Sequence, residues 1–97
     1  MIRKFGTAGT EDVFNGKNSK SARKACPRDL WAVATRKLDQ LDSAECLEDL
    51  KIPPGNRLEA LSGNREGQHS IRINGQYRIC FHWTDSGPDS VEIVDYH

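Results

Sequence analysis

The sequence predicts an α+β domain in which two or three N-terminal helices pack on one face of a small twisted antiparallel sheet. Apolar residues recur every three or four positions in the first half of the chain and every second position in the second half. A Pro-Pro-Gly-Asn segment at 53–56 separates the two patterns. Helices followed by consecutive strands are typical of α+β folds, and the length suits one domain covering 1–97.

In the N-terminal half we expect a short helix over 10–15, with Thr10 as its N-cap and Gly16 at its end. The polar and basic stretch 17–26 is expected to be a flexible loop. Pro27 suits the first turn of a longer helix, and 42–49 adds a further helical turn. The longer helix carries an apolar stripe formed by Leu30, Trp31, Ala34, Leu38 and Leu41.

The C-terminal half predicts four strands separated by Gly- and Asn-rich turns. We expect them at 57–61, 68–73, 77–83 and 91–96, with a short edge strand at 2–5. In the first of the four, Leu58 and Ala60 suit the core. Arg57, Glu59 and Leu61 should therefore point to the opposite face.

The central hairpin has a register that its apolar residues determine. For both apolar sets to line one face, residue 73 must pair with 77 and residue 71 with 79. This pairing predicts a three-residue loop, 74–76, in which Gly75 takes positive φ. The other face then carries Ser70, Arg72, Arg78, Cys80 and His82. Arg72 lies opposite Arg78, and like charges in this position cost stability unless an anion lies beside them.

Composition excludes several classes of protein. No apolar run approaches the roughly 20 residues that a membrane span needs, and the N-terminus lacks a signal-peptide pattern, so we expect a cytoplasmic protein with no membrane partner. Cys26, Cys46 and Cys80 are odd in number and widely spaced, which suits neither disulfides nor a metal site. We expect all three to be small buried side chains.

The net charge of zero conceals an uneven distribution. The first 40 residues contain nine basic and four acidic residues, a balance of +5, so the remainder carries −5. A cationic half is compatible with a phosphate-rich partner and equally with a solvated surface.

Metal-independent cleavage of RNA needs three chemical groups. A base removes the proton from the 2′-OH, an acid protonates the leaving 5′ oxygen, and a cation stabilises the phosphorane between them. The base could be Glu59, the acid His97 and the cation Arg78.

Three segments resemble the HigB branch of the RelE/ParE toxin superfamily, and most closely its GraT-like subgroup. They are 53–72, the Tyr-Arg-Ile-Cys-Phe-x-Trp run at 77–83, and the ending at 91–97. The resemblance implies a microbial-RNase-like fold and ribosome-dependent cleavage of mRNA in the decoding site of the small ribosomal subunit. It also implies inhibition by a helix-turn-helix antitoxin of the HigA type. It implies no metal or organic cofactor.

The resemblance also assigns roles to individual residues. Arg78 matches the arginine that contacts the scissile phosphate, and Asp95, Tyr96 and His97 match an ending whose histidine is catalytic. The chain departs from several HigB proteins at Glu59, where they have histidine, and at Ser62, where they have lysine. In the related YoeB toxins, a glutamate at the position that matches Glu59 works as the general base.

We therefore predict catalysis by Glu59, Arg78 and His97, with Tyr96 and Asp95 shaping the pocket. Three further arginines are expected to contact RNA phosphates: Arg57, Arg65 and Arg72. Structural roles stay open, such as an ion pair of Glu59 with Arg57 or Arg72 and a hydrogen-bonding role for Asp95. The alternative function is that of the ParE branch, a toxin that inhibits DNA gyrase by binding without catalysis.

Overall fold

A computed structural model describes residues 1–96, and it has helices before strands as predicted. The helices are α1 (Ala8–Phe14), α2 (Lys20–Ala25) and α3 (Trp31–Ser43). The strands are β1 (Glu59–Ala60), β2 (His69–Arg72), β3 (Tyr77–Thr84) and β4 (Gly87–Asp95). Short 3-10 helices lie between them: η1 (Arg28–Leu30), η2 (Leu47–Lys51), η3 (Pro54–Asn56) and η4 (Gly63–Arg65).

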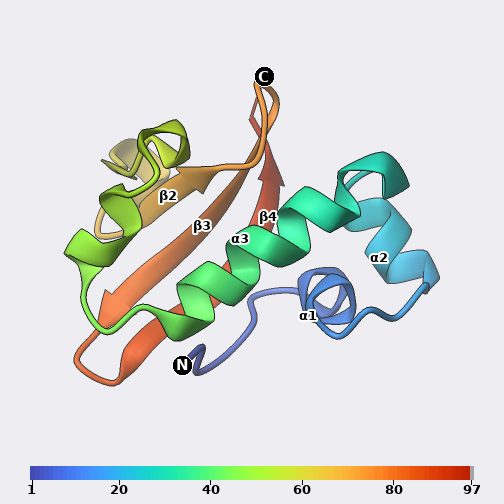
Figure 1. The fold of residues 1–97 in the computed structure, drawn as a ribbon, viewed down its shortest axis with the longest axis horizontal. Helices are drawn as coiled ribbons and strands as arrows, with labels where there is room; N and C mark the ends of the chain where they lie inside the picture. Colours follow the sequence, from blue (N-terminus) through green and yellow to red (C-terminus); the bar gives the residue numbers. More distant parts are fainter. Residues whose placement is uncertain (97) are drawn as a thin grey trace.

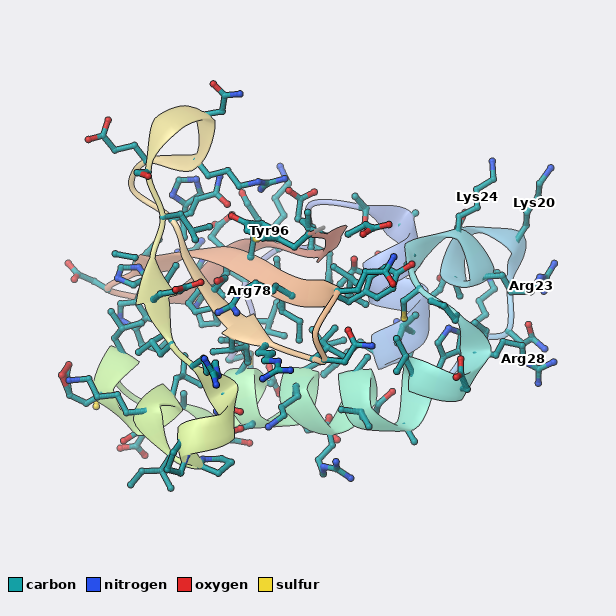
Figure 2. The ribbon with its side chains drawn as sticks, turned by 90° about the horizontal axis from the view of Figure 1, so that it is seen from above. Lys20, Arg23, Lys24, Arg28, Arg78 and Tyr96 are labelled. Atoms are coloured by element: carbon teal, nitrogen blue, oxygen red, sulfur yellow. The ribbon has the colours of Figure 1, made fainter. Side chains whose placement is uncertain are left out.

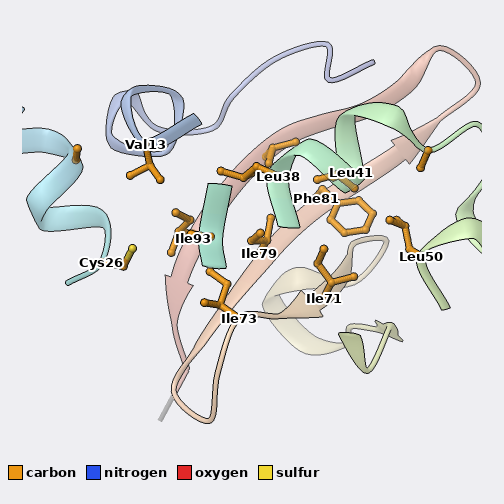
Figure 3. Close-up of a cluster of buried hydrophobic side chains, with 14 residues drawn as sticks. Val13, Cys26, Leu38, Leu41, Leu50, Ile71, Ile73, Ile79, Phe81 and Ile93 are labelled. Carbon is orange, nitrogen blue, oxygen red and sulfur yellow. The ribbon is translucent and has the colours of Figure 1, made fainter. Parts of the chain in front are cut away.

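The strands form one antiparallel sheet in the order β1-β2-β3-β4, and α3 crosses one face of it (Figure 1). Leu38 and Leu41 of α3 are fully buried against Ile71, Ile79 and Phe81 of the sheet (Figure 3). This confirms the predicted α+β class and the predicted apolar stripe. No helix in the part of the chain described is long and apolar enough to cross a membrane.

The cap of the first helix was predicted incorrectly. The helix begins at Ala8, and the Thr7 hydroxyl accepts a hydrogen bond from the Thr10 amide. Thr10 is buried inside the helix, and its Oγ1 accepts a hydrogen bond of 2.9 Å from the Ile93 amide. The hydroxyl therefore joins α1 to β4 instead of capping the helix.

The expected flexible loop at 17–26 is also wrong, because it contains α2. The Ser19 hydroxyl caps this helix by accepting from the Ala22 amide at 3.0 Å, and it donates to Asp12 at 2.6 Å. Ala22 is fully buried. One buried alanine and one cap are enough to dock this short helix, and neither leaves an apolar repeat in the sequence.

The predicted register of the hairpin is confirmed: Ile71 pairs with Ile79 and Arg72 with Arg78. The expected positive φ of Gly75 is wrong. The Asn74 side chain shapes the loop instead, because its Oδ1 accepts from the amides of Gln76 at 2.9 Å and Tyr77 at 2.7 Å. Such a turn needs no left-handed residue.

Each predicted strand differs from the observed one in at least one boundary, and β2 and β3 differ by only one residue at an end. β1 is a two-residue edge strand, and Ala60, which was expected in the core, is exposed. The expected strand at 2–5 is a single bridge from Phe5 to Val91. β4 begins at Gly87, since the turn before it is only two residues long. The helical turn expected at 42–49 is present in part, as the end of α3 and the start of η2.

Candidate functional site

A cleft of about 460 Å³ opens at the end of the sheet where β2 ends and β3 begins. It is lined by Arg57, Glu59, Arg72, Asn74, Gly75, Arg78 and Tyr96. Five of these residues are among those predicted for the site: Arg57, Glu59, Arg72, Arg78 and Tyr96. They come from β1 and the loop before it, from β2, from β3 and from the residue after β4. Figure 2 shows Arg78 and Tyr96 on the sheet.

Arg78 is the buried cation of the cleft, with only 9% of its surface exposed. Its Nε donates to the Ser70 hydroxyl at 2.7 Å, and its Nη2 donates to the Arg57 carbonyl oxygen at 2.7 Å. Two fixed acceptors therefore hold the plane of the guanidinium. Among the described residues Nη1 has no hydrogen-bond acceptor, which leaves it available to an anion in the cleft.

Glu59 lies opposite Ser70 in the ladder between β1 and β2. One carboxylate oxygen is 3.3 Å from Nη2 of Arg78, while the side chain stays 55% exposed. Glu59 therefore pairs with Arg78, not with Arg57 or Arg72, the partners considered from the sequence. A carboxylate that is solvent-accessible and lies beside a fixed cation can accept a proton from a ligand bound to that cation.

Arg57 holds its backbone in the left-handed region, with φ of 45°. The loop before it is anchored to α3 through Asn56, which is fully buried. Asn56 Nδ2 donates to the Leu50 carbonyl oxygen at 3.1 Å, and Lys37 Nζ donates to Asn56 Oδ1 at 2.5 Å. Burial, with Arg36 nearby, lowers the pKa of Lys37. These contacts set the position of the Arg57 carbonyl that binds Arg78.

The cleft contains more positive than negative charge. Three guanidinium groups, from Arg57, Arg72 and Arg78, face one carboxylate, that of Glu59, and the phenol of Tyr96. The predicted opposition of Arg72 and Arg78 occurs here. Glu59 offsets part of this repulsion, and a phosphate in the cleft would offset the remainder.

The structure does not bring two of the predicted residues into this cleft. Arg65 donates to Glu92 at 2.7 Å and to Gln68 at 3.2 Å, and the hydrogen bond from Arg65 to Glu92 raises the pKa of Arg65. Asp95 lies opposite Tyr77 and lines a different cavity, of about 430 Å³, beside α1 and α2. Its carboxylate also accepts from Gln76 Nε2 at 3.2 Å.

His97, the predicted acid, lies outside the described residues.

Sequence reasoning did not single out Ser70, whose hydroxyl accepts a hydrogen bond from Arg78 Nε. The predicted register already placed it on the same face as Arg78 and two pairs away in the ladder, a diagonal spacing that long side chains bridge. That spacing was the available signal. Asn74 was also missed, because its contribution to the cleft depends on the turn that its own side chain forms.

The described residues contain no group of three or more His, Cys, Asp or Glu side chains able to hold a metal ion. The expectation for the cysteines is wrong in one respect. Cys26 and Cys80 are buried, whereas Cys46 is exposed at the start of η2.

A protein-family model described as the RelE-like toxin HigB of type II toxin–antitoxin systems matches residues 8–97. The chain belongs to this family. The predicted HigB-type resemblance is therefore confirmed, and the GraT-like subgroup stays a prediction.

Curated relatives agree with this HigB-like assignment. Toxin HigB-1 of Vibrio cholerae is 58% identical over 50 residues, which are 52% of this chain and 53% of that protein. A protein of Haemophilus influenzae is 38% identical over 60 residues, which are 62% of this chain and 59% of that protein. The matches thus span little more than half the length of these relatives.

A solved structure, the YoeB-YefM complex from Staphylococcus aureus, has the same fold as this HigB-like chain. The TM-score is 0.60 at 14% identity, and the alignment covers 100% of this chain and 98% of that one. At this identity the likeness concerns the fold alone.

Proposed function

We propose that this HigB-like toxin is a ribosome-dependent endoribonuclease that cuts mRNA in the decoding site of the small ribosomal subunit. The observation that carries the proposal is the pairing of the exposed Glu59 carboxylate with the buried, fixed guanidinium of Arg78 at 3.3 Å. A purely binding toxin, such as one that inhibits gyrase, has no need of a base beside a preorganised phosphate-binding cation.

The proposed reaction uses the 2′-OH of the RNA as nucleophile. Glu59 takes the 2′ proton as the 2′ oxygen attacks the adjacent phosphorus, and the bond from phosphorus to the 5′ oxygen breaks. His97 gives its proton to that leaving oxygen. The products are a 2′,3′-cyclic phosphate and a free 5′-hydroxyl.

Arg78 would stabilise the negative charge that develops on the phosphorane. Its bonds to Ser70 and to the Arg57 carbonyl hold the guanidinium in place before substrate binds, which reduces the reorganisation needed in the transition state. Tyr96, 42% exposed on the rim, would contact the nucleotide at the scissile bond. Arg57 and Arg72 would bind flanking phosphates, and Asp95 would hold the chain end through Gln76.

The proposed inhibitor is a HigA-like antitoxin with a helix-turn-helix domain, and the proposed compartment is the cytoplasm. The family model supports an antitoxin partner because it describes the toxin of a type II toxin–antitoxin system.

The test compares cleavage of ribosome-bound mRNA by primer extension for wild type, Glu59→Gln and His97→Ala. Each variant should cut roughly 10²–10⁴-fold more slowly, the usual loss when a general acid or base is removed. Glu66→Gln, at an exposed glutamate outside the cleft, is the matched control and should cut at the wild-type rate. Wild-type rates in both site variants, or equal cleavage of free mRNA, would refute the proposal.

A further inference from the structure

A second cationic surface lies at the end of the molecule formed by α2. We define the α2 cationic surface by five exposed residues: Lys17, Lys20, Arg23, Lys24 and Arg28. With Asp29 included, the segment 17–29 carries five positive charges and one negative charge, a balance of +4. Figure 2 shows the four labelled members of this surface grouped at one end, with Arg78 and Tyr96 on the sheet away from them.

No ion pair of the described chain joins a carboxylate to this surface, although Asp95 lines one cavity with Lys24. Within residues 1–96 the ion pairs involve Lys51, Arg65 and Arg78, and none involves a member of the α2 cationic surface. Arg23 donates to the neutral Asn18 side chain at 2.8 Å, and Arg28 lies 5.7 Å from the centre of the Trp31 ring. The charges are therefore available to an external anion.

The helix that carries these charges is fixed to the rest of the fold. The Ser19 hydroxyl joins its start to Asp12 at 2.6 Å, and Ala22 is fully buried beneath it. On the α1 side, Gly9 lies so close to the Ser21 carbonyl oxygen that a side chain at position 9 would collide with it. A partner that binds this surface meets cations already held in place, which lowers the entropic cost of binding.

The chemistry of the surface favours a nucleic acid over a protein. The exposed positions of α2 are Lys20, Ser21, Arg23 and Lys24, and its fully buried residue is apolar, Ala22. Protein interfaces have an apolar core, whereas nucleic-acid interfaces are polar and strongly positive. The large exposed apolar side chains of the described chain, Met1, Ile52 and Tyr96, belong to other segments.

We infer that the α2 cationic surface docks on the phosphate backbone of ribosomal RNA while the cleft holds the mRNA. This inference rests on the proposed function. Lys24 lines a separate cavity with Tyr77 and Asp95, so the α2 cationic surface lies beside the cleft and is not part of it. Folded RNA that surrounds a protein of 31 × 27 × 26 Å can contact both surfaces together.

The experiment measures binding to purified small ribosomal subunits at several salt concentrations. The test variant carries Lys20→Gln, Arg23→Gln and Lys24→Gln, and the matched control carries Arg3→Gln, Lys4→Gln and Arg36→Gln, at three cations outside the surface. Each lost phosphate contact lowers the slope of log K against log salt by about 0.7–0.9, so the test variant should lose about two to three units of slope.

At saturating toxin the test variant should still cleave ribosome-bound mRNA at the wild-type single-turnover rate, because the cleft is unchanged. Circular dichroism checks that α2 keeps its helical content. The control variant should keep the wild-type slope, and binding of both variants to a free mRNA oligonucleotide should match wild type.

Three results would overturn the inference. The first is a wild-type salt slope in the test variant, and the second is a loss of affinity for the free oligonucleotide equal to the loss for the ribosomal subunit. The third is a variant that loses affinity for the antitoxin but none for the ribosomal subunit. The last would identify an acidic protein surface as the partner. A reduced slope combined with no cleavage by wild-type toxin would support the docking surface and count against the proposed activity.

Discussion

At the scale of single residues, the cleft depends on how one buried guanidinium is held. Arg78 donates from Nε to the Ser70 hydroxyl and from Nη2 to the Arg57 carbonyl oxygen, both at 2.7 Å. Ser70 itself is fully buried, so water cannot replace its hydroxyl. Under the proposed function, Ser70 is a positioning residue that would act on RNA through Arg78.

Ser70→Ala should therefore affect chemistry more than binding. Small misplacements of a catalytic group reduce rate strongly, so we expect single-turnover cleavage at saturating toxin to fall by roughly 10-fold or more, with little change in ribosome affinity. A purely structural role for Ser70 would instead lower stability alone, by about 1.5–3 kcal/mol for a lost bond to a charged group. Thermal unfolding measured beside the kinetics separates the two, and an unchanged rate would contradict the positioning role.

The three thiols should also differ sharply in reactivity. Burial raises the pKa of Cys26 to about 11, with Asp29 acting in the same direction, and burial likewise raises the pKa of Cys80. Because the thiolate is the reactive form, both should resist modification in the folded protein. We expect a chromogenic disulfide reagent at a pH of about 8 to titrate one thiol rapidly, and none rapidly in Cys46→Ser. Fast reaction of two or more thiols in native protein would contradict the burial.

At the scale of elements, the contact between α1 and α2 determines where the basic residues lie. Gly9 is buried, and a Cβ at this position would collide with the backbone of Ser21. Backbone atoms cannot rotate aside as a side chain can, so α2 would have to move.

Gly9→Ala should consequently destabilise the fold by about 1–3 kcal/mol, the usual range for overpacking. For a domain of this size, each kcal/mol lowers the melting temperature by about 4–8 °C. Gly55→Ala is the matched control, because nothing lies within 4 Å of a Cβ at position 55. Melting curves of the two variants give the comparison, and equal melting temperatures would show that α2 is not docked as described.

At the scale of the whole molecule, stability comes from the packing of α3 on the sheet. Leu38 and Leu41 are fully buried against Ile71, Ile79 and Phe81. A single core of this kind typically leaves a net stability of only about 5–15 kcal/mol for a domain. Loss of one large side chain is therefore a substantial fraction of the total.

Leu38→Ala should lower the free energy of unfolding by about 2–5 kcal/mol, from lost burial and from the cavity left behind. Ile52→Ala, at a side chain that is 73% exposed, should change it by less than about 0.5 kcal/mol. In urea denaturation, an unchanged slope of the free energy of unfolding against urea concentration would establish that Leu38→Ala alters stability alone. A loss below about 1 kcal/mol for Leu38→Ala would show that α3 does not cover the core.

The amino-acid sequence by itself determined the fold class, the long helix and the register of the central hairpin. Alternating apolar residues specify which side chains share a face, and a shift by one position would expose all of them. For this reason the alternation alone places Arg72 opposite Arg78, as the ladder between β2 and β3 has them. The chemistry of RNA cleavage indicated Glu59, and the family resemblance added Tyr96; both line the cleft.

Only the tertiary structure decided which groups meet. Periodicity assigns a residue to a face but does not say which neighbours cover it. The contacts of Glu59 with Arg78, of Arg65 with Glu92 and of Thr10 with Ile93 join distant segments. The helix α2 was not predicted for a related reason. Besides its local cap, it is stabilised by the bond from Ser19 to Asp12 and by the burial of Ala22, and both of these act only once α1 lies beside α2.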